Sequence, residues 1–109
     1  MITKTKKATA DSAQTFSVTS DGAHWICSGS LVFDTARSAL EHSRALALPA
    51  SGEIDCAHIS HVDSTAVAFL LAMKRRAIDE QRTLTFIHTP PALLDLAALY
   101  GAADLLFPG

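Results

Sequence analysis

The densest group of chemically reactive side chains lies between residues 56 and 65, and consists of Cys56, His58, His61, Asp63, Ser64 and Thr65. Thiolate, imidazole and carboxylate groups are the ligands that zinc prefers, so a metal site is one hypothesis. The spacing matches no usual pair of zinc ligands, although a regular strand would send Cys56 and His58 to one face. We therefore favour a buried thiol and two loop histidines, and we predict no metal and no cofactor.

Nucleophilic catalysis is a second hypothesis, in which His58 or His61 would activate the hydroxyl of Ser64 or Thr65. Such catalysis needs convergent groups and an oxyanion hole, which sequence neighbours rarely supply. The chain has no Gly-x-Ser-x-Gly elbow and no glycine-rich phosphate loop. We therefore expect no catalytic residue and no enzymatic activity.

A structural role is the third hypothesis for Asp63, Ser64 and Thr65, because they directly precede an apolar run. Asp or Ser at this place is a favourable N-cap, with a contribution of about 1 kcal/mol. The N–H groups of a helix N-terminus also attract a phosphate or the carboxylate of a partner. An exposed turn of this kind can therefore cap a helix and serve as a docking point.

The elements that position this turn follow from hydrophobic spacing and from turn residues. Asp21-Gly22 between two alternating segments predicts a hairpin, and Asp34 and Pro49 are expected to begin and end a helix. We expect strands at 14–20, 23–29, 51–59 and 82–88, and helices at about 35–48, 64–80 and 90–100. The buried side of the second helix is expected to consist of Val67, Leu70, Leu71, Met73, Ala77 and Ile78.

The element order β-β-α-β-α-β-α predicts an α/β fold. We expect a small sandwich with a mixed, mostly parallel four-stranded sheet, an N-terminal β-hairpin and helices packed on it. Residues 1–14 are expected to be a disordered tail, and residues 15–109 a single domain. Cys27 and Cys56 lie in apolar stretches and are expected to be buried free thiols.

The composition restricts the class of protein. The formal net charge is −2, which argues against a nucleic-acid partner. No apolar stretch reaches the roughly 20 residues that cross a bilayer, and no signal peptide is recognisable, so we expect a cytoplasmic protein.

The C-terminal segment is unusually apolar. Thr89 is expected to cap its helix, Pro90 to occupy the first helical position and Gly101 to follow its end. The helix has more apolar residues than one buried stripe needs, namely Leu93, Leu94, Leu96, Ala97, Ala98, Leu99 and Tyr100. Either some of them form a partner-binding patch, or the apolar residues 102–109 fold back and cover them.

The segment "IDCAHISHVDSTAVAFLLAMKRRA" resembles the signature of the STAS domain family, which occurs in sulphate-transporter tails and anti-sigma-factor antagonists. Asp55 matches the acid that ends the family's third strand, and Asp63, Ser64 and Thr65 match the turn before the next helix. The likeness covers about residues 15–107 and includes "CSGSLVFDTA". In the antagonists the second hydroxyl of the turn is the phosphorylated switch, and Thr65 holds its place. Ala66 replaces the usual glycine, and its methyl group is expected to crowd a kinase.

The segment "LTFIHTPPALLDLAALYGAADLL" is similar to the lipid-asymmetry (MlaB) branch of the family, through Leu96, Leu99 and Tyr100. That resemblance implies a non-catalytic subunit that binds and stabilises an MlaF-like ATPase of an ABC transporter, within a complex with a membrane permease. The transporter moves phospholipids between the inner and outer membranes. The chain would be peripheral to the inner membrane through this complex, without direct membrane insertion.

The resemblance also implies roles for particular residues. The implied partner-binding residues are Asp63, Ser64, Thr65, Leu99 and Tyr100, and Ser64 matches the hydroxyl at the ATPase contact. The alternative function that the family implies is an anti-sigma-factor antagonist, switched by phosphorylation of Thr65 or Ser64.

Overall fold

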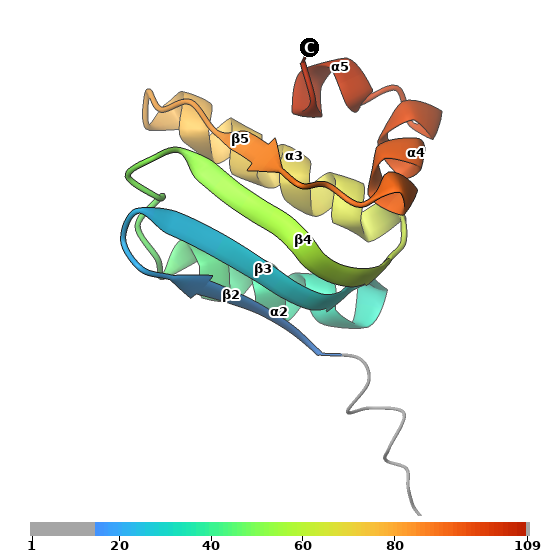
Figure 1. Ribbon diagram of the computed structural model, residues 1–109, viewed down its shortest axis with the longest axis horizontal. Coiled ribbons are helices and arrows are strands. Elements are labelled where there is room, and N and C mark those ends of the chain that lie inside the picture. The colour runs from blue at the N-terminus through green and yellow to red at the C-terminus, as the bar shows by residue number, and fades with distance from the viewer. Residues whose placement is uncertain (1–14, 109) are drawn as a thin grey trace, which may run out of the picture.

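The computed structural model of the protein describes residues 15–108, which form a four-stranded sheet with helices α2 and α3 behind it (Figure 1). The elements are β2 (Phe16–Ser20), β3 (His24–Leu31), α2 (Phe33–Arg44), β4 (Glu53–Val62), α3 (Ser64–Asp79), β5 (Thr85–Ile87), α4 (Pro91–Leu99) and α5 (Ala103–Leu106). The strand order is β2-β3-β4-β5, antiparallel between β2 and β3 and parallel elsewhere. These features confirm the predicted fold class. The predicted tail at residues 1–14 lies outside the described residues.

The hairpin between β2 and β3 forms as its sequence predicts. Oδ1 of Asp21 accepts hydrogen bonds from the N–H groups of Ala23, at 2.9 Å, and His24, at 2.7 Å. Gly22 has φ +90°, a left-handed conformation that a residue with a side chain rarely adopts. This turn places Trp25 at the start of β3, where its side chain is fully buried and its indole N–H donates to the carbonyl of Ala47 at 3.0 Å.

The core lies between the sheet and the two helices that cover one face of it. From α3, the side chains of Leu70 and Met73 are buried, as predicted, but Ile78 is 74% exposed and was wrongly placed on the buried side. Phe69 is buried instead, edge-to-face with Phe16 of β2 at a centroid distance of 5.9 Å. The buried side of α3 therefore includes Phe69 and does not include Ile78.

Both cysteines are buried and free, as predicted. Desolvation raises the pKa of Cys27 and raises that of Cys56 to about 12, with the nearby Asp55 carboxylate adding to the effect at Cys56. A thiol with so high a pKa is protonated at neutral pH and is a poor nucleophile.

Strand β4 is longer than predicted and contains two irregularities. Its pairing with β3 shifts between Ile26 and Ser28, where β4 advances from Asp55 to His58, and again between Gly29 and Ser30. Each shift adds one residue to β4, which reverses the facing of the side chains that follow. His58 is consequently exposed while Cys56 is buried, so the expectation that they share a face is wrong.

Asp55 stabilises the first irregularity of β4 and does not end the strand, contrary to the expectation from the family signature. Its Oδ1 accepts a hydrogen bond from the N–H of Ala57 at 2.9 Å and lies 3.2 Å from Nδ1 of His88. The Ala57 hydrogen bond is the main reason that the pKa of Asp55 is lowered. The strand continues to Val62, so His58 and His61 lie in it rather than in a loop.

Three predicted helix boundaries are wrong. Helix α2 begins at Phe33 with Val32 as its N-cap, so Asp34 lies in the first turn and is not the cap. The same helix ends at Arg44 rather than at Pro49. Pro90 is the N-cap of α4 and not its first residue, and Thr89 precedes the cap with a buried hydroxyl that makes no hydrogen bond with any described residue.

The C-terminal residues return to the sheet, as predicted. Gly101 follows the C-cap of α4 with φ +72°, which turns the chain into α5. Leu106 is buried, and the ring of Phe107 packs edge-to-face on Phe86 at a centroid distance of 6.2 Å. The return does not cover the excess apolar residues, because the side chains of Leu94, Leu99, Tyr100 and Leu105 are exposed. No helix within residues 15–108 has the length and apolar character to cross a membrane.

Candidate functional site

Two helices begin at the edge of the sheet where β3 and β4 end. Because these strands are parallel, their C-terminal ends meet at one edge, with Leu31 paired to Val62. One residue separates each strand from the helix that follows, Val32 before α2 and Asp63 before α3. The two N-termini place unpaired N–H groups and two positive dipole ends at the same edge.

Asp63 caps both helices. Its Oδ1 accepts hydrogen bonds from the backbone N–H of Thr65, at 2.9 Å, and from the hydroxyl of Thr65. Its Oδ2 accepts a hydrogen bond from the N–H of Phe33, the first residue of α2, at 2.9 Å. The N-cap of α2, Val32, has no polar atom in its side chain, so the carboxylate of Asp63 takes that role as well. We call this arrangement the shared cap.

The shared cap lowers the pKa of the Asp63 carboxyl. Desolvation acts in the opposite direction, since partial burial disfavours the charged form. The hydroxyl of Thr65 and the N–H groups of Phe33 and Thr65 more than offset it, because all three donate to the carboxylate. Asp63 is therefore charged at neutral pH and held in a fixed position.

Thr35 holds the first turn of α2 from the inside. Its hydroxyl donates to the carbonyl of Ser30 at 2.6 Å and accepts from the N–H of Val32 at 3.1 Å. The side chain is buried, so these bonds are shielded from water. Thr35 was not predicted from the sequence, because the usual signal for such a helix start is Ser or Thr at the cap with Glu or Gln three positions later, and here Val32 is the cap and Thr35 occupies the third position.

The two hydroxyls of the predicted site have different surroundings. Ser64 is exposed, and its side chain makes no hydrogen bond with any described residue. Thr65 is partly buried, and its hydroxyl is occupied by Asp63. Ser64 is consequently the accessible hydroxyl, whereas Thr65 is part of the shared cap.

Ala66 follows these hydroxyls and is completely buried. Its N–H donates to the carbonyl of Asp63 at 3.0 Å. Its methyl group faces the core and not the surface, so the expectation that it would crowd an approaching protein is wrong.

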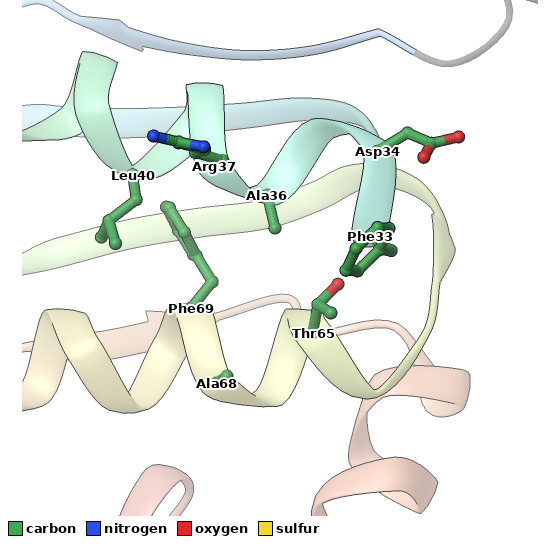
Figure 2. Close-up of a pocket in the computed structure, with 8 residues that line it drawn as sticks. All are labelled: Phe33, Asp34, Ala36, Arg37, Leu40, Thr65, Ala68 and Phe69. Carbon is green, nitrogen blue, oxygen red and sulfur yellow. The ribbon is translucent and has the colours of Figure 1, made fainter.

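An open apolar groove of about 610 Å³ separates α2 from α3, beside the shared cap (Figure 2). Phe33 and Thr65 lie at one end of it, Leu40 at the other, and Phe69 points from α3 toward α2. Phe33 is 76% exposed, an unusual state for a large aromatic side chain. We call it the α2–α3 groove, and its lining residues are Phe33, Asp34, Ala36, Arg37, Leu40, Thr65, Ala68 and Phe69.

Of the residues that line this groove, only Thr65 is predicted from the sequence as a site residue. The available signal was the spacing of Phe33, Ala36, Arg37 and Leu40, which places them on one side of a helix. This side of α2 adjoins the buried side that carries Thr35. It is recognisable as a separate surface only when the position of α3 is known.

Leu99 and Tyr100 do not join the turn residues. Both lie at the C-terminal end of α4 and are exposed, 74% and 58% respectively. Helix α3 lies between α2 on one side and α4 and α5 on the other, in both views (Figures 1 and 2). The five predicted partner-binding residues therefore belong to two surfaces, separated by α3.

The histidines near the turn are not arranged to activate its hydroxyls. Nδ1 of His61 lies 3.3 Å from the hydroxyl of Ser30 and 3.1 Å from that of Ser60, and it makes no hydrogen bond with Ser64 or Thr65. Within residues 15–108, no cluster of three or more His, Cys, Asp or Glu side chains is placed to hold a metal ion.

The comparisons with known proteins agree with this architecture. A family model described as "Mlab, STAS domain" matches residues 17–107. No curated protein matches the chain. The matched segment includes every strand and helix except Phe16, the first residue of β2, and on this basis the chain belongs to the STAS domain family.

Proposed function

We propose that this chain is a non-catalytic subunit that binds and stabilises the ATPase of an ABC transporter moving phospholipids between the inner and outer membranes. The ATPase docks in the α2–α3 groove, beside Ser64 and the shared cap. The chain works in the cytoplasm, held at the inner membrane through this complex.

The observation that carries the proposal is the exposed apolar groove next to a fixed polar turn. Phe33 offers a large aromatic side chain at the mouth, and Phe69 supplies an apolar floor. Aromatic residues in such positions dominate the energetics of protein interfaces. Ser64 adds an unoccupied hydroxyl at a helix N-terminus, which suits a carbonyl or carboxylate of the partner.

The description of the matching family model supports the choice of partner, since it names MlaB. A subunit that binds only the folded ATPase stabilises it by mass action, without any chemistry of its own. This accounts for a surface of apolar and capping residues with no activated nucleophile.

Co-purification with the ABC ATPase of the organism's own phospholipid-transport system tests the proposal. Ser64→Arg places a large charged side chain at the turn without removing a hydrogen bond, so the domain stays folded. At a docking surface it buries an unpaired charge, which typically costs several kcal/mol and lowers the affinity at least about a hundredfold.

Ser64→Ala is the matched control, because it removes the hydroxyl without adding bulk, and we expect most of the binding to remain. Failure of the parent chain to capture the ATPase would refute the function. Full capture by Ser64→Arg and by Phe33→Asp would refute the docking surface.

Thr65→Glu does not separate ATPase binding from stability. Its carboxylate would meet that of Asp63 and would replace the hydroxyl that donates to it. We therefore expect this variant to lose stability as well as ATPase binding, which makes Ser64→Arg the better test.

An anti-sigma-factor antagonist switched by phosphorylation is the second candidate, and the free hydroxyl of Ser64 favours it. A phosphate there would bring a charge of about −1.5 to −2 to the edge of the docking groove. Incubation with a purified anti-sigma kinase should then label the parent chain and not Ser64→Ala. Labelling that persists in Ser64→Ala and disappears in Thr65→Ala would assign the switch to Thr65.

A further inference from the structure

A second apolar groove lies on the other side of α3, between its C-terminal half and α5. Its volume is about 560 Å³. Ile78 of α3 and Leu105 of α5, 74% and 68% exposed, supply large apolar side chains. We call it the α3–α5 groove, and its lining residues are Leu71, Lys74, Arg75, Ala77, Ile78, Arg82, Thr83, Leu84 and Leu105.

The charges that line this groove are all positive. Lys74 donates to the carbonyl of Leu84 at 2.7 Å, and Arg82 donates to that of Pro49, so their partners are uncharged. Arg75 is exposed, and neither it nor the other two cations forms an ion pair with any residue of 15–108. The α3–α5 groove therefore combines apolar walls with three positive charges that no carboxylate of the described residues neutralises.

The neighbouring helices α4 and α5 have the opposite character. Asp95 and Asp104 are their only charged residues, and both are exposed. They stand among exposed apolar side chains, of which Leu99 is 74% and Tyr100 is 58% exposed. We call the exposed residues Asp95, Leu99, Tyr100, Asp104 and Leu105, which lie on α4, α5 and the link between them, the acidic strip.

We propose that the α3–α5 groove binds the acidic strip of a second copy of this chain, in a symmetric dimer. A two-fold interface needs a surface that is complementary to itself, and this face carries both halves: a cationic apolar groove and an acidic apolar strip. Leu105 belongs to both, since it lines the groove and lies on α5. It is therefore expected near the two-fold axis.

The mixture of charges argues for a second copy over an anionic membrane surface. A membrane would attract Lys74, Arg75 and Arg82 but repel Asp95 and Asp104, which are exposed on the neighbouring helices α4 and α5. In a dimer, by contrast, both sets of charges find partners of opposite sign, and the exposed apolar side chains are buried at the same time. The α2–α3 groove remains open, because it lies across α3 from this face.

Sedimentation velocity of the full chain over a range of concentrations tests the dimer. We expect a shift from monomer to dimer with rising concentration, and weaker association at about 500 mM salt than at about 50 mM because salt screens charges. A chain that stays monomeric at every concentration and salt would overturn the proposal and leave this face to a different protein.

Charge exchange makes the test specific. Arg75→Glu and Asp95→Arg each change an exposed side chain, and each alone should weaken the dimer about tenfold or more, because like charges then face one another. An equimolar mixture of the two variants should recover association, since each then presents the sign that the other needs.

Arg37→Glu on α2 is the control, because Arg37 is 90% exposed and lies on the far side of α3. It changes the net charge by the same amount as Arg75→Glu and should leave the dimer intact. Two results would overturn the assignment: a dimer that all three variants weaken equally, or a mixture that does not recover. Circular dichroism of each variant confirms that the fold is retained.

Discussion

The grooves on the two sides of α3 have similar volumes, about 610 and 560 Å³, but are organised in different ways. On the α2 side, a carboxylate fixes the starts of two helices, so the α2–α3 groove has a polar end held by hydrogen bonds of 2.9 Å. On the α5 side, exposed apolar residues stand beside three cations in the groove and two carboxylates on α4 and α5, and no carboxylate among residues 15–108 bridges two helix starts there as Asp63 does. The first arrangement suits a partner that must dock in one orientation, and the second suits association through apolar burial and charge attraction.

The largest effect on stability is expected at a residue that supports both grooves beside α3. Leu70 is completely buried in the middle of α3, between the sheet and the two surfaces. Leu70→Ala should lower the free energy of unfolding by about 2–5 kcal/mol, because it removes apolar contacts and leaves a cavity. Urea denaturation measures this value. A stability equal to that of the parent would show that α3 is not the shared support of both surfaces.

Removal of the shared cap should affect the α2 side selectively. Asp63→Ala leaves the first N–H groups of α2 and α3 without their acceptor, and we expect a loss of roughly 2–3 kcal/mol, about the sum of two caps. Hydrogen exchange would then rise at the first turns of both helices. Asp63→Asn, which keeps an acceptor oxygen, should lose less. An exchange increase confined to α3 would disprove the sharing of the cap.

The shared cap also predicts a dependence of stability on pH. The pKa of Asp63 is lowered in the folded protein, so its contribution is present above its unfolded pKa of about 3.9 and is lost as the pH falls through the folded value. Below about pH 4 the parent should therefore lose stability more steeply than Asp63→Asn. Asp21 and Asp55 also have lowered pKa values, so part of the slope should remain in the variant. Identical profiles for parent and variant would contradict the role of this carboxylate.

The smallest effects on stability, and the sharpest separation of function, are expected at the surface. Phe33→Ser and Leu99→Ser change exposed side chains, so each should alter the free energy of unfolding by no more than about 0.5 kcal/mol. Phe33→Ser should lose ATPase binding and keep the dimer, and Leu99→Ser should do the reverse. Pull-down and sedimentation of the same samples would show this. Loss of both properties in either variant would mean that the two sides are not independent.

The features that the sequence predicts well depend on local chemistry. Asp21-Gly22 sets a hairpin through contacts within three residues, and Gly101 ends α4 through its own backbone conformation. The apolar spacing of α3 likewise gives that helix within one residue of its end. In each case the deciding contacts lie within a few positions of one another in the chain.

The features that the sequence does not predict depend on distant contacts. By residue type, Asp34 is a better cap than Val32, but α2 begins earlier because its acceptor comes from Asp63, thirty positions further along. The two irregularities of β4 reverse the facing of residues such as His58, so alternation counted from Cys56 fails. The α2–α3 groove requires the relative position of two helices, which local patterns do not contain.

The burial of Trp25 has a practical consequence for measuring these properties. It is the only tryptophan of the chain, it is fully enclosed, and its indole N–H is bonded to a backbone carbonyl. Its fluorescence in the folded protein is therefore that of an indole screened from solvent, and the emission shifts to longer wavelength when unfolding admits water. Because Trp25 lines neither groove, a ligand that fills either one leaves this signal unchanged. The fluorescence of Trp25 therefore reports unfolding of the domain and does not report occupation of either groove.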